Sequence, residues 1–403
     1  MSTDKVQRAL DDWQSSERRN GKQHRRTMYY LGYYIYIMHN NNIDCISLIA
    51  EFMSRLENYE DWKNDDISDA LTFVAYVLYL KDDDKAAYPL IRRAVAIVDY
   101  LSERNLYDPA FTWSIYVYVL RSLELYKQEI PYDEKLLESL LKKKGERSSE
   151  VVFHLMRLDV AYSYCGRYSK AVKCAEKALE LHRKYHADDR ERTILCLSNL
   201  AIDLSCSGRP EEELRIREEA LSLTQEVYGA DSEKGIEAYE RFCKALLKYS
   251  SDRMNKPEGL LHKAILRHYQ LMQLKISISG CSDPSVLQTK RDLIALYEKN
   301  GQITRAVTFQ TELVSESRDQ NDPPDFFSNR DRYHLIELYW KSGSHKNALL
   351  MAQSLLSELT EGLDRETVLQ DIKSKEPSID VKGILMTRVF LQKNQKIAST
   401  TIE

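Results

Sequence analysis

Two matched segments decide the fold: VVFHLMRLDVAYSYCGRYSKAVKCAEKALEL at residues 151–181 and TILCLSNLAIDLSCSGRPEEELRIREEALSL at residues 193–223. They align when Gly166 is placed over Gly208, an offset of 42 residues. The same offset joins further identical pairs: Arg167 with Arg209, Ala178 with Ala220, Leu179 with Leu221 and Leu158 with Leu200. A fixed offset of this size indicates consecutive helical hairpins. Glycine ends the first helix of each hairpin, and small residues allow the two helices to approach closely.

This pattern resembles the tetratricopeptide repeat. Leu200-Ala201 stands where that family has Leu-Gly or Leu-Ala, and Ala220 stands where it has its late Ala. The step of 42 residues, longer than the usual ~34, and the phrase SLTQEVYGADS at 222–232 resemble the kinesin-light-chain type of repeat. The resemblance implies an all-α fold, a right-handed superhelical solenoid of about eight antiparallel helical hairpins.

The composition suits a helical protein and excludes several other classes. The 403 residues include only 13 Gly and 9 Pro, and the net charge of −4 gives no global attraction to a polyanion or a membrane surface. The longest apolar run, at 28–38, is too short to cross a bilayer, and the polar N-terminus excludes a secretory signal. The seven cysteines form no Cys-x-x-Cys pair and are interpreted as buried, reduced thiols. We therefore expect a cytoplasmic location, with the nucleus as the alternative, and no membrane insertion.

The repeat signature is uneven along the chain. Asp82 lies two periods before Gly166, and Gly301 and Gly343 keep the same step of 42 residues. Between Gly208 and Gly301 lie 93 residues, so one insertion of about nine residues interrupts the array. The predicted division is: 1–24, an N-terminal helix and basic linker; 25–148, degenerate repeat-like hairpins; 149–361, the repeat array with an irregular hairpin at 233–276; and 362–403, a C-terminal cap and flexible tail. The basic cluster at 18–26 is interpreted as a solvated linker face, with a nuclear signal or a phosphate contact as alternatives.

Motifs for catalysis or for a cofactor are missing from the sequence. There is no Gly-rich phosphate loop, no Gly-x-Ser-x-Gly and no His-Glu-x-x-His. His182 and His186 lie one helical turn apart, but they lack a third ligand and flank Arg183 and Lys184. We interpret them as structural or surface residues rather than metal ligands. We therefore expect neither a metal nor a cofactor.

The family resemblance implies that the first helix of each hairpin lines the inner face and contacts ligands. Counting back from each glycine turn assigns the following peptide-binding residues: Arg157, Asn199, Arg241, Lys244, Lys248, Arg291, Lys299, Tyr333 and Lys341. Such repeats often clamp an extended peptide, with Asn on its backbone and cations on its carboxylates, and Asn199 matches a position where the family has such an Asn. The alternative is that these are ordinary solvated charges on helix surfaces.

These observations favour a protein–protein interaction scaffold, or adaptor, whose inner face binds linear, acidic segments of a protein or peptide partner. One alternative is an enzyme with a pocket near the irregular sixth hairpin, which a closed cavity lined by titratable groups would support. Another is a single-stranded RNA-binding solenoid, which the negative net charge disfavours. The 26 tyrosines are interpreted mainly as packing between hairpins, with a recognition groove as the alternative. The oligomeric state is left open.

Overall fold

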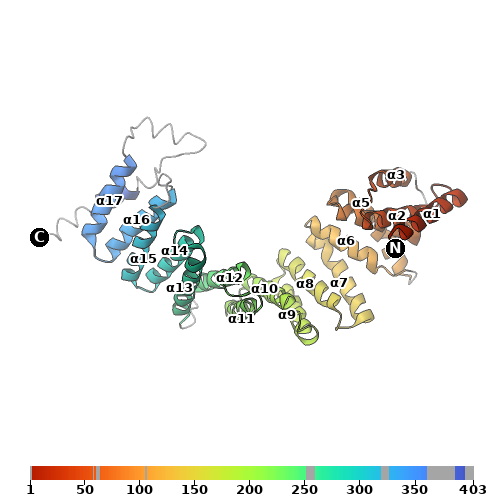
Figure 1. Cartoon of the computed structure of the whole chain (residues 1–403). Helices are drawn as coiled ribbons and strands as arrows, with labels where there is room; N and C mark the ends of the chain where they lie inside the picture. Colours follow the sequence, from red (N-terminus) through yellow and green to blue (C-terminus); the bar gives the residue numbers. More distant parts are fainter. Residues whose placement is uncertain are drawn as a thin grey trace. The chain divides into compact units, whose positions relative to one another are not determined.

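The structure is a computed structural model that describes residues 2–57, 59, 64–104, 107–250, 259–318, 326–360 and 386–394. Every regular element in these ranges is an α-helix, as Figure 1 shows. The chain forms two compact units, Met1–Ile216 and Arg217–Glu403, and their boundary falls inside a helix. The predicted all-α fold of repeated helix pairs is confirmed, whereas the handedness and the number of hairpins stay predictions.

The first unit holds ten helices among its described residues: α1 (Ser2–Asn20), α2 (Arg25–Asn40), α3 (Ile46–Glu57), α4 (Asp65–Leu80), α5 (Asp84–Ser102), α6 (Ala110–Ser122), α7 (Tyr126–Lys144), α8 (Ser149–Tyr164), α9 (Tyr168–Tyr185) and α10 (Arg190–Cys206). Helix α11 (Pro210–Tyr228) crosses the boundary between the units. Helix α1 lies within residues 1–24, where the sequence predicts an N-terminal helix and basic linker.

The second unit continues the pattern with α12 (Glu233–Ser250), α13 (Leu260–Ser279), α14 (Pro284–Lys299), α15 (Ile303–Arg318), α16 (Phe326–Lys341) and α17 (His345–Thr360). A further helical segment covers 386–394, within the predicted C-terminal cap. Residues 361–385 and 395–403, which make up most of the predicted C-terminal cap and flexible tail, lie outside the described residues, as do residues 251–258 of the predicted irregular hairpin.

A left-handed residue marks the turns at the predicted period. Gly166, Gly208, Gly301 and Gly343 have φ between 70 and 81°. Asp82 and Glu124, at two periods and one period before Gly166, share this conformation with φ of 59 and 58°. The hairpin of α6 and α7 belongs to the predicted degenerate part of the array at 25–148, yet its turn residue Glu124 keeps the register.

The first helices of neighbouring pairs form one layer of the first unit, because α2 contacts α4, α4 contacts α6, and α8 contacts α10. Gly32 allows the close approach of α2 to α4. A Cβ atom at Gly32 would lie 2.9 Å from both Cα and the carbonyl oxygen of Ala70. The Leu31-Gly32 pair therefore does what the repeat signature implies, since it lets two helix backbones touch.

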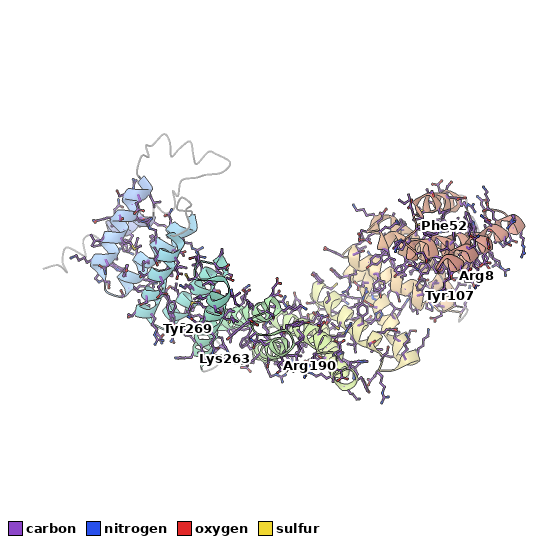
Figure 2. The ribbon with its side chains drawn as sticks, in the orientation of Figure 1. Arg8, Phe52, Tyr107, Arg190, Lys263 and Tyr269 are labelled. Carbon is purple, nitrogen blue, oxygen red and sulfur yellow. The ribbon has the colours of Figure 1, made fainter. Side chains whose placement is uncertain are left out.

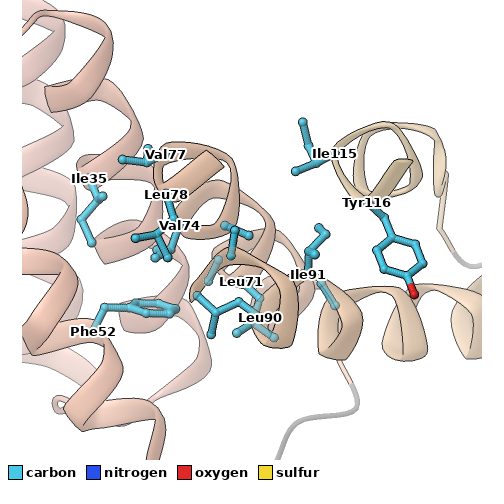
Figure 3. Packing of buried hydrophobic residues seen from close by; sticks show 14 of the residues in the cluster. Ile35, Phe52, Leu71, Val74, Val77, Leu78, Leu90, Ile91, Ile115 and Tyr116 are labelled. Atoms are coloured by element: carbon cyan, nitrogen blue, oxygen red, sulfur yellow. The ribbon is translucent and has the colours of Figure 1, made fainter. Parts of the chain in front are cut away.

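Apolar residues at helical spacing supply the core between these helices. Figure 3 shows Ile35 of α2, Phe52 of α3, Leu71 of α4 and Ile91 of α5 in one cluster, and all four are fully buried. Side-chain caps fix where the helices begin. The Asn64 side chain, for example, accepts a hydrogen bond from the backbone N–H of Ile67 at 3.0 Å.

Candidate binding face

Three of the predicted cations lie on α12 and are exposed. A guanidinium nitrogen of Arg241 lies 2.6 Å from Glu237, and the Lys244 ammonium lies 3.9 Å from Glu240. The Lys248 ammonium lies 4.8 Å from the ring centroid of the adjacent tyrosine. Exposed pairs one helical turn apart are weak, so Arg241 and Lys244 can exchange their partners at little cost.

Two other predicted cations tie α14 to α16. Arg291 donates through two nitrogens to Asp331, with the shorter contact at 2.8 Å. Lys341 lies 2.9 Å and His334 lies 2.6 Å from the carboxylate of Glu298. The hydrogen bond from His334, followed by that from Lys341, lowers the pKa of Glu298 to about 2 against the effect of burial. These cations therefore already form ion pairs with carboxylates of their own unit.

Two more predicted residues lie on the same helices. Lys299, at the end of α14, is exposed. Tyr333 of α16 is half-buried, and burial together with the nearby Glu337 raises the pKa of its hydroxyl. Both side chains are at least partly exposed, so either could contact a ligand.

Arg157 is placed differently, because it is only 5% exposed. One of its guanidinium nitrogens lies 3.2 Å from Glu129 and another lies 3.5 Å from Asp133. The guanidinium carbon also lies 4.5 Å from the ring centroid of Tyr118. Arg157 thus joins α6, α7 and α8 inside the unit and offers little surface to a partner.

Arg157 belongs to a buried charged network. Arg121 donates to Glu129 at 2.6 Å, and His154 lies 2.8 Å from Asp133. Burial raises the pKa of Glu129 to about 7 despite Arg121, with the charge of Asp133 acting in the same direction. The pKa of Asp133 is lowered, because His154 and Arg157 outweigh the effect of its burial.

Asn199 leads to a second buried group that sequence reasoning missed. Its side-chain amide donates to Asp159 at 3.4 Å, and Asp159 and Asp203 are 1% and 3% exposed. Burial, then the charge of Asp203, raises the pKa of Asp159 to about 8, and burial raises the pKa of Asp203 to about 6. One oxygen of each carboxyl has no hydrogen-bond partner among the described residues.

The repeat register contains the signal that could have found these acids. Asp159 occupies the position that holds Ala75 in α4 and Ala201 in α10, one or two periods away. Asp203 occupies the position of Val77 in α4 and of Ala161 in α8. A carboxyl at a core position of a repeat departs from the repeat pattern and costs desolvation energy without improving the packing. Such departures concentrate at functional sites.

An exposed apolar row also follows the repeat step. Phe111 on α6, Phe153 on α8 and Leu195 on α10 are separated by 42 residues each and are 42%, 38% and 51% exposed. We call these three residues the exposed row. It continues into an aromatic strip, whose rings lie 5.4 to 6.5 Å from their neighbours: Tyr33, Tyr36, Phe73, Tyr76, Tyr79, Phe111 and Tyr118. The tyrosines of the strip are half-buried, so they pack on one another and still present a surface.

In the second unit, a cavity of about 170 Å³ lies among α12, α13 and α14. Helix α13 can be followed in Figure 2 by its labelled residues Lys263 and Tyr269. Most of the surface that faces the cavity is apolar, although most of the lining residues carry polar groups: Glu240, Cys243, Lys244, His268, Leu271, Lys275, Ser285, Gln288, Thr289 and Asp292. Burial raises the pKa of Cys243 to about 12, which keeps its thiol protonated and a poor nucleophile. The cavity lies at the predicted irregular hairpin and is lined by several titratable side chains, so the enzyme alternative stays a prediction.

The histidine pair is engaged within the protein. The Nε2 atom of His182 lies 2.9 Å from the carbonyl oxygen of Asp189, and the rings of His182 and His186 lie 5.8 Å apart. Across the described ranges, no group of three or more His, Cys, Asp or Glu side chains is arranged to hold a metal ion. No helix in these ranges has the length and apolar character needed to cross a membrane.

Comparisons with known proteins point to the same repeat. The tetratricopeptide repeat family model matches residues 157–226. No curated protein matches the chain. Among solved structures, a kinesin light chain with nearly identical TPR-like repeats from Podosopora anserina is 15% identical, covers 52% of this chain and 95% of its own, and gives a TM-score of 0.41.

Two other solved structures resemble nearly the whole chain. The apo form of RapI is 13% identical, with 97% of this chain and 98% of its own covered and a TM-score of 0.46. NprR in complex with its cognate peptide NprX is 15% identical, with 97% and 98% covered and a TM-score of 0.35. At such low identities and TM-scores, these similarities carry no argument about what this chain binds.

Proposed function

We propose that this chain is an interaction scaffold that holds a linear segment of a partner protein, since residues 157–226 match the tetratricopeptide repeat model. The segment lies on the face made by the first helices. The exposed row carries this proposal, since Phe111, Phe153 and Leu195 repeat one register position on consecutive first helices and stay 38% to 51% exposed. An exposed apolar row that follows the architecture is a feature of binding surfaces.

In the first unit, the exposed row and the aromatic strip determine which side chains of a partner can bind. Aromatic rings offer large contact areas with little loss of side-chain entropy, and tyrosine adds a polar group at its edge. A segment with apolar or aromatic side chains, in an extended conformation, matches this surface. We further propose that the partner is a cytoplasmic or nuclear protein, in line with the sequence.

A preference for acidic segments belongs to the second unit in this proposal. Support comes from Arg241 and from Lys244, whose side chain is 71% exposed and lies 3.9 Å from its acid. Arg291 and Lys341 would require an incoming carboxylate to compete with Asp331 and Glu298. Acidic residues of the partner are therefore expected at α12 rather than at α14.

The exposed row can be tested with a phage-displayed library of linear peptides, panned on the full chain. A recovered peptide is then titrated by fluorescence anisotropy against a variant with Phe111→Ala and Phe153→Ala. We expect at least a tenfold weaker Kd, because both anchors of the row are lost. The matched control is Ile46→Ala on α3, whose side chain is 63% exposed but lies off the row. Failure to enrich any peptide, or equal binding by both variants, would overturn the proposal.

The acidic preference has its own test. An acidic peptide pool is titrated at low and high salt against the chain and against a variant with Arg241→Glu and Lys244→Glu. Charge reversal at these exposed positions should weaken binding several-fold at low salt and much less at high salt. If the affinity is unchanged, the acidic preference is wrong, while the role of the exposed row is unaffected.

A further inference from the structure

Asp69 is the residue of α4 that occupies the register position of the exposed row. It lies 42 residues before Phe111, the same step that separates Phe111 from Phe153 and Phe153 from Leu195. Like those residues, Asp69 belongs to a first helix, and its side chain is partly exposed. A carboxyl group therefore stands on α4 where α6, α8 and α10 present apolar side chains.

Aromatic rings connect Asp69 with the exposed row. Phe73 lies one helical turn after Asp69 on α4, and its ring centroid is 5.9 Å from that of Phe111. From α2, the rings of Tyr29 and Tyr33 lie 6.0 and 5.6 Å from the ring of Phe73. These two tyrosines and Phe73 are partly exposed. Asp69 thus borders an aromatic surface that continues into the row and lies within the first unit.

The carboxyl of Asp69 lacks a cation. In the described ranges it accepts a hydrogen bond from the Tyr107 hydroxyl but forms no ion pair, whereas Asp66 pairs with Arg25 at 3.5 Å. Its other oxygen has no partner in these ranges and is not fully buried, so a ligand can reach it. Burial raises the pKa of Asp69 against the hydrogen bond from Tyr107, and the charges of Asp65 and Asp66 add to the effect of burial. An incoming cation would relieve this repulsion.

The combination of a carboxylate and aromatic faces selects a guanidinium group. A half-buried carboxylate without a counter-charge attracts a positive charge, and the faces of aromatic rings attract cations as well. A guanidinium meets both demands, because its planar fork donates to a carboxylate while its face stacks on a ring. An ammonium is more strongly hydrated and does not stack. An anionic or apolar side chain would leave the charge of Asp69 without a partner.

We propose that Asp69 and the adjacent rings of Tyr29 and Phe73 bind an arginine side chain of the segment that the scaffold holds. This inference rests on the proposed function, and it names one residue that the partner carries. Neighbouring helices lie about 9 Å apart, a distance that an extended chain spans with about three residues. The arginine is therefore expected about three residues away from the side chain that contacts Phe111.

Fluorine NMR of the full chain labelled with 4-fluorophenylalanine can test the site through Phe73, whose resonance a Phe73→Leu variant assigns. The probes are the N-acetyl methylamides of arginine, citrulline, lysine and leucine at neutral pH. Citrulline has nearly the size and planar shape of arginine but no charge. The arginine probe should shift the Phe73 resonance saturably, with a Kd in the range of about 1 to 10 mM that is usual for a small ligand. The other three should bind at least about fivefold more weakly.

Equal binding of the arginine probe and any of the other three, or no shift with arginine, would overturn the inference. Two variants then locate the effect. Asp69→Asn removes the negative charge and keeps an oxygen that can accept from Tyr107, so it should abolish the preference for arginine over citrulline. Asp65→Asn removes an exposed acid of the same helix and should leave that preference intact. If Asp69→Asn fails to fold, the comparison of arginine with citrulline on the original chain still decides the question.

Panning of the peptide library separates this inference from the scaffold proposal. Peptides selected on the original chain should carry arginine at the expected distance from an apolar side chain, and peptides selected on Asp69→Asn should not. Peptides that bind at the exposed row without arginine, and equally well to both chains, would refute the arginine site alone. If no peptide is enriched while the arginine probe still shifts Phe73, the scaffold proposal fails and the site is one for small guanidinium compounds.

Discussion

The first helices α4 and α8 occupy the same place in the repeat but have different cores. At one register position α4 has Ala75 and α8 has Asp159, and both residues are buried. Two positions later in the repeat, α4 has Val77 whereas α10 has Asp203. The α4 region uses these positions for close apolar packing, and the α8–α10 region places carboxyls there. The difference teaches that helix stacking accommodates buried acids at these positions. They should therefore give the α8–α10 region a pH dependence that Ala75 and Val77, which cannot ionise, do not give to α4.

The largest expected effect is a loss of stability of the α8–α10 region as pH rises. The folded-state pKa of Asp159, about 8, lies above its ordinary value of 3.8. Its contribution is therefore fully present below pH 4 and is lost as pH rises towards 8, by about 1.4 kcal/mol per pH unit. Asp203, with a pKa of about 6, acts in the same direction at lower pH. Chemical unfolding should show the free energy of unfolding falling by about 4 to 5 kcal/mol between pH 5 and 7.5, about 3 kcal/mol of it from Asp159.

Asp159→Asn tests the source of this slope, because Asn cannot ionise. The variant should lose most of the pH dependence and should be more stable than the original chain at pH 8. The groups that face Asp159, namely Asn199, Asp203, Arg121 and Cys174, remain in place. Glu150→Gln is the control, since Glu150 lies exposed on the same helix and should leave the slope unchanged. An unaltered slope in Asp159→Asn would show that Asp159 is already ionised in the fold.

A smaller effect is expected in the apolar region, where Gly32 lies against α4. Gly32→Leu places a branched side chain where even a Cβ would be 2.9 Å from the Ala70 backbone. We expect a loss of about 2 kcal/mol or more at every pH. Thermal unfolding measures it, and Arg26→Leu, at an exposed position of α2, is the control. A loss that changed with pH would contradict the contrast between the two regions.

The sequence predicted how the array is built better than it predicted what the array does. The step from Gly166 to Gly208 was sufficient to predict the all-α fold. A turn glycine and the spacing of apolar residues both depend on local backbone geometry, which the sequence determines directly. The site depends on contacts between helices that lie about 40 residues apart. Arg157 and Lys244 read alike in the sequence, yet one is 5% exposed and the side chain of the other is 71% exposed. Buried His268, whose Nε2 has no hydrogen-bond partner in the part of the chain that the structure describes, is likewise a product of packing that no sequence motif indicates.

The smallest effect concerns the turns that follow α4 and α8. Gly166 and Asp82 are equivalent and both have positive φ, of 70 and 59°. A Cβ at Gly166 would meet nothing within 4 Å, so Gly166→Ala should cost only the backbone strain, about 1 kcal/mol. Asp82→Gly should stabilise by about 0.5 kcal/mol, less than the reverse change costs, because Asp tolerates this conformation and Gly makes the unfolded chain more flexible. Effects of opposite sign on the free energy of unfolding in urea would show that the two regions share the same turn geometry. If both variants were destabilised, the Asp82 side chain must make a contact in the fold that outweighs the strain.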